Sequence, residues 1–362
     1  MKIVLESSSL FFKKYTGIPN YIYNLYNAMS SINGVSPILG FRLKKIVTSK
    51  NTFQKELLKK NHAWHTAGIL LPPKKVTVAH SLHTPFLNHK NALRVATIHD
   101  LAVHLPQFDN YAFASEYFKQ KRMSLFNQFY KNADALVAVS QATKNDFLNF
   151  FDFPEERIHV VPLAPSINSK IALVANTNDE LKQMDLEPKS YFIAVGGVSL
   201  RKNTFNLIKG YHLSKSQKQY KLVITGKIET IHEKPIREYI SKNKLQDKII
   251  ITSYLSNSML NILYNNAKAF LFPTFYEGFG IPILEAMQAR LPVLTSNTGA
   301  APETANGHAV LVNPFEPSSI AIGIDQMNSI TETILDKAEN FAKKHTWDNT
   351  AKMTLDIYKK YT

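Results

Sequence analysis

Cysteine is absent from the 362 residues of this sequence. The absence excludes a disulfide framework, a thiolate metal site and a cysteine nucleophile. Long apolar runs are also missing, and none approaches the ~20 residues of a membrane-spanning helix. Residues 1–6 turn polar at once and lack the apolar core of a signal peptide. We therefore expect a cytoplasmic protein.

Acidic residues are scarce: 28 Asp and Glu stand against 43 Lys and Arg, so the formal net charge is +15. Such an excess favours polyanionic partners, namely nucleic acid, an anionic membrane surface or a phosphorylated substrate. Solvated lysine-rich faces explain the charge equally well. The basic residues form no dense run and no recognition motif, which disfavours a nucleic-acid-binding protein.

The length of the chain fits two domains. Short apolar runs alternate with helical stretches in both halves, which indicates parallel, doubly wound sheets. A polar stretch at residues 164–190 separates the halves. The sequence thus predicts an α/β protein with two similar domains facing a cleft. The predicted ranges are residues 1–165, residues 166–345, and a C-terminal helix at residues 346–362.

One stretch, residues 272–287, combines carboxylates with a glycine-containing elbow. It follows a predicted strand at residues 269–272, and Pro282 is expected to open a helix because its fixed φ suits the first turn. Glu277 lies in the elbow and Glu285 eight residues later in the helix. Carboxylates accept hydrogen bonds from hydroxyls, and a helix N-terminus attracts anions. The stretch predicts a site for a sugar and a phosphate, although surface carboxylates are the simpler explanation of the pair alone.

A second turn, residues 196–203, follows a predicted strand at residues 191–195 and opens a helix. Arg201 and Lys202 stand where they would neutralise a diphosphate through charge-assisted hydrogen bonds. The spacing is neither that of a P-loop nor that of a dinucleotide-binding fingerprint. A solvated basic turn is the alternative.

The first half offers two further candidates at the carboxyl ends of predicted strands. Gly17 lies in the turn at residues 16–19, before a helix predicted from Pro19, and would let a ligand approach the backbone closely. His99 directly follows the predicted strand at residues 94–98. Ligands of doubly wound sheets bind beyond the carboxyl ends of strands. An ordinary tight turn and a satisfied core histidine are the respective alternatives.

Two histidine pairs have i, i+3 spacing: His62 with His65, and His80 with His83. Neither has an adjacent acidic cluster, so metal binding is disfavoured. A helix expected at residues 112–131 interleaves aromatic and basic residues. Such a helix lies on anionic lipid or, more commonly, packs on its own sheet.

Taken together, these segments resemble the retaining, nucleotide-sugar-dependent glycosyltransferases of family 4, whose GT-B fold has two Rossmann-like domains. The resemblance covers nearly the whole chain, and the two glutamates with the Lys202 turn are its most specific part. Bacterial mannosyltransferases that build O-antigen and other surface polysaccharides are the most similar members. The resembling segments are residues 17–25, 97–101, 138–144, 157–162, 195–203, 277–285 and 297–303.

The resemblance implies an N-terminal acceptor-binding domain, a C-terminal donor-binding domain and a C-terminal helix that crosses back. It implies that Glu277 contacts the donor sugar, Glu285 the ribose, and Lys202 with Arg201 the diphosphate. His99 would lie near the donor sugar and the acceptor, completing a catalytic set of Glu277, His99, Lys202 and Arg201. The other implied donor contacts are Gly17, Gly197, Asn203, Leu255, Gly278, Phe279, Gly280 and Ile281.

The implied reaction is transfer of a hexose, mannose from GDP-mannose, to a saccharide or lipid-linked acceptor in surface polysaccharide or lipopolysaccharide synthesis. Configuration would be retained, and no metal, other cofactor or nucleic acid is expected. Peripheral contact with the cytoplasmic face of an anionic inner membrane is a further expectation. A UDP- or ADP-sugar donor and a nucleotide-sugar epimerase remain alternatives. A phosphorylase is disfavoured because nothing resembles a pyridoxal-phosphate lysine environment.

The sequence departs from the family at one position. Many members carry arginine immediately after the first glycine of the second-domain turn, where this chain has Gly197. We expect Arg201 to take over part of that charge.

Overall fold

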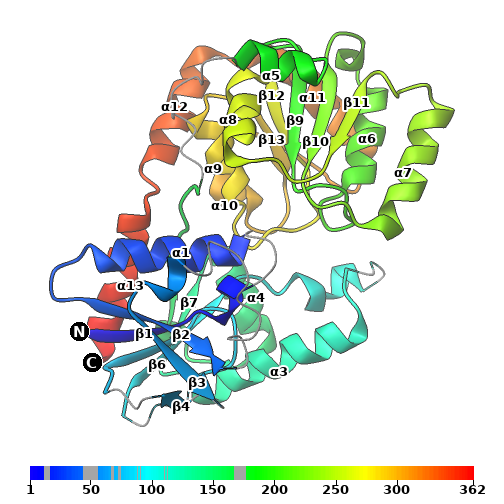
Figure 1. The fold of residues 1–362 in the computed structure, drawn as a ribbon. Coiled ribbons are helices and arrows are strands. Elements are labelled where there is room, and N and C mark those ends of the chain that lie inside the picture. The colour runs from blue at the N-terminus through cyan, green and yellow to red at the C-terminus, as the bar shows by residue number, and fades with distance from the viewer. Residues whose placement is uncertain are drawn as a thin grey trace. The chain divides into compact units, whose positions relative to one another are not determined.

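The computed structural model divides into two compact units (Figure 1). Unit 1 comprises Met1–Leu105, Ala114–Ser166 and His345–Thr362, and unit 2 comprises Pro106–Phe113 and Ile167–Lys344. The structure describes residues 1–11, 17–43, 56–66, 69–71, 75–87, 89, 91–109, 111, 113–166 and 177–362.

Within the described residues, unit 1 contains a sheet of eight strands in the order β4-β3-β2-β1-β5-β6-β7-β8. All neighbours are parallel except β3 and β4. The chain adds β2 and β3 on one side of β1 and the later strands on the other, so the switch point lies between β1 and β5. The strands are β1 (Lys2–Glu6), β2 (Ser36–Arg42), β3 (His62–Thr66), β4 (Ile69–Leu71), β5 (Val78–Ser81), β6 (Leu93–Ile98), β7 (Ala135–Ala138) and β8 (Ile158–Val160).

The helices of unit 1 start at identifiable caps. The side chain of Ser115 accepts a hydrogen bond from the backbone N–H of Phe118, and that of Ser140 accepts one from Thr143. Such caps satisfy amides that the first turn leaves unpaired. The helices are α1 (Gly17–Ser30), α3 (Glu116–Asn132), α4 (Gln141–Phe150) and α13 (Trp347–Tyr361), with 3₁₀ turns at Ser8–Phe11, Ala102–His104 and Glu155–Arg157.

The last helix, α13, belongs to unit 1, where it packs against α1 (Figure 1). The indole N–H of Trp347 donates to the carbonyl of Pro165 at 3.0 Å, and the hydroxyl of Thr350 donates to the carbonyl of Pro162 at 2.8 Å. Nδ1 of the buried His80 lies 2.5 Å from the hydroxyl of Tyr358. The polar bonds and the packing therefore make α13 an integral part of unit 1.

The described part of unit 2 contains a parallel sheet of six strands in the order β11-β10-β9-β12-β13-β14. Its switch point lies between β9 and β12. The strands are β9 (Tyr191–Val195), β10 (Lys221–Thr225), β11 (Ile249–Thr252), β12 (Ala269–Phe272), β13 (Val293–Ser296) and β14 (Val310–Val312). The helices are α5 (Thr177–Gln183), α6 (Thr204–Leu213), α7 (Thr230–Lys242), α8 (Asn257–Asn266), α9 (Ile281–Gln288), α10 (Ala301–Ala305), α11 (Pro317–Gln326) and α12 (Glu332–Lys343), with 3₁₀ turns at Pro106–Phe108, Lys215–Lys218 and Met327–Ser329.

The predicted α/β class with two doubly wound sheets is confirmed. The apolar pattern of residues 75–79 predicts a strand there, but β5 begins three residues later, at Val78. The sequence patterns did not predict β3, β4 and α7. Helix α7 contains Pro235, which lacks an N–H and interrupts a helical pattern. The helix predicted from residue 112 begins at Glu116, after the Ser115 cap.

The segment Pro106–Phe113 lies with unit 2, whereas the predicted range 1–165 assigned it to the first domain. Aromatic packing explains the difference. The ring centroid of Tyr111 lies 4.9 Å from that of Phe275, and Phe108 stacks on Phe315 at 6.3 Å. None of the described helices combines the length and apolar character needed to cross a bilayer.

Candidate functional site

The centre of the candidate site is an ion cluster in unit 2. Nζ of Lys202 lies 2.8 Å from Oε1 of Glu277, and Nη1 of Arg201 lies 3.3 Å from the same oxygen. Nη1 of Arg201 also donates to the carbonyl of Tyr276 at 3.1 Å. The Glu277 side chain is 10% exposed, against 19% for Lys202 and 35% for Arg201. Two cations share one carboxylate, so the cluster carries one net positive charge and suits an anion.

Sheet topology explains why residues so far apart in sequence meet. Arg201 and Lys202 belong to the turn after β9, and Glu277 belongs to the elbow after β12. These two strands are neighbours on either side of the switch point. Ligands of open α/β sheets bind at this place. The backbone N–H of Phe275 donates to the carbonyl of Arg201 at 3.1 Å and joins the two loops.

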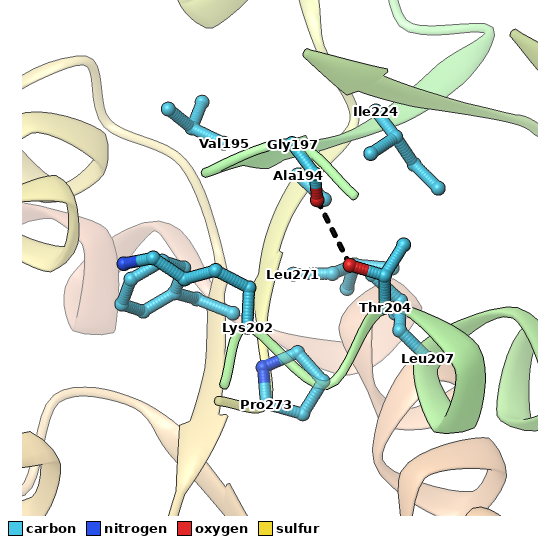
Figure 2. Close-up of a pocket in the computed structure, with 10 residues that line it drawn as sticks. Ala194, Val195, Gly197, Lys202, Thr204, Leu207, Ile224, Leu271 and Pro273 are labelled. Atoms are coloured by element: carbon cyan, nitrogen blue, oxygen red, sulfur yellow. Dashed lines mark hydrogen bonds between the residues drawn. The ribbon is translucent and has the colours of Figure 1, made fainter. Parts of the chain in front are cut away.

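Side-chain hydrogen bonds of Asn203 and Thr204 fix the turn after β9. Asn203 adopts a left-handed conformation with φ of 58°, and its buried amide donates to the carbonyls of Pro273 and Pro314 at 2.9 and 2.6 Å. The hydroxyl of Thr204 donates to the carbonyl of Gly197 at 2.8 Å, as Figure 2 shows. Asn203 thus anchors the turn. Its predicted contact with the nucleotide-sugar donor stays a prediction.

A small pocket under this turn is lined mainly by apolar side chains of β9, β10, β12 and α6 (Figure 2). The side chain of Lys202 lies along its edge, with Nζ 4.9 Å from the ring centroid of Phe272. A cation over an aromatic face is stabilised by the ring quadrupole. The aromatic contact therefore helps to direct the ammonium toward Glu277.

The structure accounts for the glycine at position 197. Its φ is 78°, and a Cβ there would lie 1.9 Å from the carbonyl oxygen of Lys227 and 2.5 Å from the Lys227 nitrogen. The arginine that the family resemblance predicts at this position has no room beside this backbone. The expectation that Arg201 supplies part of the missing charge agrees with its position next to Glu277.

The elbow after β12 is held by a neighbouring loop. The backbone N–H of Ala300 donates to the carbonyl of Glu277 at 3.0 Å, and a Cβ at Gly299 would lie 2.9 Å from that oxygen. Gly280, with φ of 98°, caps α9, which begins at Ile281 next to Pro282. The predicted helix start is confirmed. The elbow residues Gly278 and Phe279 lie between Glu277 and this cap.

Glu285 projects from α9 into the interior and is 4% exposed. The hydroxyl of Tyr264, on α8, lies 3.4 Å from its Oε2. Burial, followed by the charge of Glu285, raises the pKa of Tyr264 well above its ordinary value, so the phenol remains a donor. The sequence analysis missed Tyr264, because only the packing of α8 on the sheet brings it to Glu285. Leu255, the predicted contact to the base, lies in the loop between β11 and α8.

Gly17 and His99 lie in unit 1. Gly17 is the first residue of α1, and no atom of the described residues lies within 4 Å of a Cβ built there. Nε2 of His99 donates to the carbonyl of Leu82 at 2.8 Å, and burial lowers the pKa of His99 to about 4. His99 is therefore neutral near pH 7, with Nδ1 as its acceptor.

The histidine pairs have other partners. Nε2 of His65 lies 3.3 Å from Oε1 of the buried Glu6, and Nε2 of His80 lies 2.8 Å from the hydroxyl oxygen of Thr97. Among the described residues, no three or more His, Asp or Glu side chains form a group that could hold a metal ion.

The aromatic and basic helix α3 has two faces. Phe126 and Phe129 are buried in the core of unit 1, as expected for a helix that packs on its sheet. Tyr117 and Phe118 are 75% and 45% exposed, with Lys121 exposed one turn later. The expected packing on the sheet is thus confirmed for the inner face of α3, and contact of the outer face with lipid stays a prediction.

Two family descriptions match the chain. Glycosyltransferase Family 4 matches residues 35–164, and Glycosyl transferases group 1 matches residues 177–345. Together the two matches cover most of the sequence. The second contains every residue of the candidate site in unit 2.

Curated relatives include O-antigen chain mannosyltransferase B of Escherichia coli, 25% identical over 283 residues that cover 76% of this chain and 72% of the relative. Serotype-specific mannosyltransferase WbdA of Escherichia coli is 28% identical over 249 residues. That alignment covers 64% of this chain but 30% of WbdA.

Solved structures show the same fold. A glycosyltransferase from Rickettsia africae superposes with a TM-score of 0.73 at 18% identity, covering 99% of this chain and 98% of the other. Anabaena Alr3699/HepE, in complex with UDP and glucose, superposes with a TM-score of 0.75 at 15% identity. The superposition covers 99% of this chain and 100% of the other. The fold is therefore GT-B. With its two family matches and an ion cluster at the switch point of unit 2, the chain belongs to the family 4 glycosyltransferases, also described as glycosyl transferases group 1.

Proposed function

We propose that the chain transfers mannose from GDP-mannose, with retention of configuration, to a saccharide or lipid-linked acceptor of surface polysaccharide synthesis. The observation that carries the proposal is the Arg201–Lys202–Glu277 cluster at the switch point of unit 2. The choice of mannose rests on relatives named as O-antigen mannosyltransferases. The alignment covers less than a third of WbdA, so we do not propose the complete activity of WbdA for this chain.

In the proposed mechanism, Lys202 and Arg201 change ion-pair partners when the donor binds. An incoming diphosphate competes with Glu277 for the ammonium of Lys202 and the guanidinium of Arg201. Glu277 then accepts hydrogen bonds from the donor sugar hydroxyls. As the bond to the sugar breaks, Lys202 and Arg201 stabilise the charge that grows on the leaving phosphate. These cations supply the counter-charge without a metal ion.

Retention follows if the acceptor attacks from the face that the phosphate leaves. In this route a phosphate oxygen takes the proton of the acceptor hydroxyl. His99 acts as a neutral hydrogen-bonding group, in keeping with its lowered pKa. NMR of the product formed with the identified donor tests retention: the anomeric proton must show the donor's configuration, and the opposite anomer would contradict the proposal.

The nucleotide base has a specific alternative. Alr3699/HepE was solved with UDP and glucose, so a UDP-sugar is the second candidate donor. An ADP-sugar donor and a nucleotide-sugar epimerase are further alternatives. A thermal-shift screen against GDP, UDP, ADP and their sugars decides among the bases, because a ligand that binds the folded state raises the unfolding temperature. Stabilisation by GDP and GDP-mannose alone supports the proposal, and selective stabilisation by UDP overturns the choice of base.

We also place the enzyme at the cytoplasmic face of an anionic inner membrane, through the outer face of α3. Tyr117 and Phe118 would enter the lipid interface while Lys121 meets the headgroups. Flotation with vesicles containing anionic lipid at low salt tests this contact. Replacing Tyr117 and Phe118 by serine should abolish flotation, whereas Ile231→Ser, at a 78% exposed residue of unit 2, should not. Failure of the unaltered protein to float would contradict it.

A further inference from the structure

Arg122 differs from every other arginine of the chain. The sequence has seven arginines, all within the described residues. Five of them make an ion pair with a carboxylate: Arg42, Arg94, Arg201, Arg237 and Arg290. Arg157 instead donates to the carbonyls of Asp134 and Ala133 at 2.6 and 2.9 Å. Arg122 has neither an ion pair with a described carboxylate nor a short hydrogen bond.

The contacts of Arg122 are long and lead to neutral groups. Its Nη1 donates to Nδ1 of His83 and its Nη2 to the carbonyl of Asp100, both at 3.4 Å. The guanidinium carbon lies 4.8 Å above the ring centroid of Phe126. Burial lowers the pKa of Arg122, and the negative charge of Asp100 offsets part of this effect. A guanidinium has five N–H donors, and only two of them form hydrogen bonds with described residues.

A largely buried cation without a close counter-ion is costly unless something compensates it. The nearby histidines do not compensate it, because burial keeps the pKa of His83 and of His99 below the ordinary value. Both rings are therefore neutral near pH 7. An anionic ligand group next to Arg122 would supply the missing counter-charge.

The neighbouring hydrogen-bonding groups suit such a ligand. Because Nδ1 of His83 accepts from Arg122, the proton of this neutral ring lies on Nε2, which is a donor. Nε2 of His99 donates to Leu82, so its Nδ1 is an acceptor for a hydroxyl. The ring centroids of the two histidines lie 6.0 Å apart. His99 and Asp100 directly follow β6, at the edge of the sheet where ligands bind.

We propose that Arg122, with His83 beside it, binds an anionic group, a phosphate or a carboxylate, on the acceptor. The assignment to the acceptor rests on the proposed function. The donor diphosphate has its own cations, Arg201 and Lys202, in unit 2. The planar guanidinium matches both phosphate and carboxylate oxygens and binds them in a bidentate manner.

Steady-state kinetics with three acceptors test the proposal. The acceptors are a mannoside joined to an alkyl chain through a diphosphate, the same mannoside joined through a neutral glycosidic oxygen, and a neutral-linked saccharide that carries a uronate. Arg122→Gln should raise KM for an anionic acceptor by about 10- to 100-fold. KM for the neutral acceptor and for the donor should stay within about twofold, and Arg122→Lys should recover part of the loss.

The arms of this experiment separate the sources of the negative charge. A selective loss with the diphosphate acceptor assigns a phosphate, and one with the uronate acceptor assigns a carboxylate. Arg94→Gln removes an equal charge from the same unit, at the ion pair with Asp134, and should change none of these values. Equal losses with all three acceptors, a raised donor KM, or no change in Arg122→Gln would overturn the proposal.

A binding measurement separates this inference from the proposed function. Inorganic pyrophosphate is titrated calorimetrically into full-length Lys202→Ala protein, in which the cluster of unit 2 is weakened. Adding Arg122→Gln should weaken the remaining binding by about tenfold or more. An unchanged affinity, or no binding before Arg122 is replaced, would overturn the anion site even if transferase activity is found. A tenfold loss would support it even if no donor is turned over.

Discussion

Lys202 and Glu277 form an ion pair 2.8 Å long between two loops that are 75 residues apart in the chain. The cation that is proposed to bind the phosphate thus orients the carboxylate. If the donor diphosphate binds Lys202 as proposed, it competes with Glu277 for this ammonium. Such a competition would link recognition of the diphosphate to the positioning of Glu277.

Glu277→Gln should lower kcat by about 100- to 1000-fold, because it keeps the shape of the side chain but removes the charge. Circular dichroism and thermal unfolding should show a folded protein. The control is Glu233→Gln on α7, which breaks the pair with Arg237 away from the turn and should leave kcat unchanged. A Glu277→Gln enzyme with near-normal turnover would refute the catalytic assignment.

Lys202 should contribute more than Arg201 to binding and turnover of the donor. Lys202 lies closer to Glu277 and is less exposed than Arg201, so solvent screens its charge less. We expect Lys202→Ala to reduce kcat/KM for the donor by about 100-fold or more, and Arg201→Ala by about tenfold. Lys209→Ala, on α6, is the matched control. The reverse ranking in donor titrations would show that Arg201 carries the main contact.

Gly197→Ala should destabilise unit 2 by more than its positive φ alone explains. A Cβ at Gly197 meets the backbone of Lys227, whereas Gly307 has nearly the same φ, 75°, and no described atom within 4 Å of a Cβ. Gly307→Ala should cost about 1 kcal/mol from φ strain, and Gly197→Ala about 2 kcal/mol or more. Thermal unfolding compares the two variants. Equal losses would mean that the loop of Lys227 moves aside at little cost.

The sequence alone predicts strands at residues 191–195, 221–225 and 269–272 and a helix at residues 141–150. These ranges agree with β9, β10, β12 and α4, because each combines an apolar run or a helical pattern with a clear boundary residue. It also predicted Lys202 and Glu277 as site residues, and the structure brings the two together. It did not predict that these two side chains bond to each other, since that depends on which strands flank the switch point. Nor did the local pattern show that Asn203 faces the interior or that Tyr264 reaches Glu285, because both follow from packing.

Tyr264→Phe removes one hydrogen bond from the buried Glu285. We expect the donor KM to rise by about three- to tenfold with little change in kcat, because Glu285 keeps its charge but loses a positioning contact. Tyr191→Phe is a matched control: it removes the bond from the buried Tyr191 hydroxyl to the carbonyl of Leu263. It should lower stability by a similar amount while leaving the donor KM unchanged.

Unit 1 should lose stability in mild acid. Burial lowers the pKa of His80 to about 3, against 6.5 in the unfolded chain. The unfolded state therefore takes up the proton first, and the free energy of unfolding falls as the pH drops from about 6.5 toward 3. By pH 4 the contribution of His80 is on the order of 3 kcal/mol.

Fluorescence measures this effect in unit 1 alone, because both tryptophans, Trp64 and Trp347, belong to it. The denaturant midpoint should fall between pH 7 and pH 4 in the unaltered protein. His80→Gln should lower the midpoint at pH 7 and flatten its dependence on pH. A slope that survives this substitution would assign the acid sensitivity to other groups.

The packing of α13 in unit 1 sets an order of events during synthesis. Residues 167–344 emerge from the ribosome before residues 345–362, yet the latter complete the older half of the chain. Until then, the pocket for Tyr358 beside His80 and the carbonyls that bond Trp347 and Thr350 have no partner from α13. Unit 1, which begins to emerge first, is thus the last to complete its fold. A chain that stops before residue 345 would leave the first unit exposed to aggregation and proteolysis, even though the second is complete.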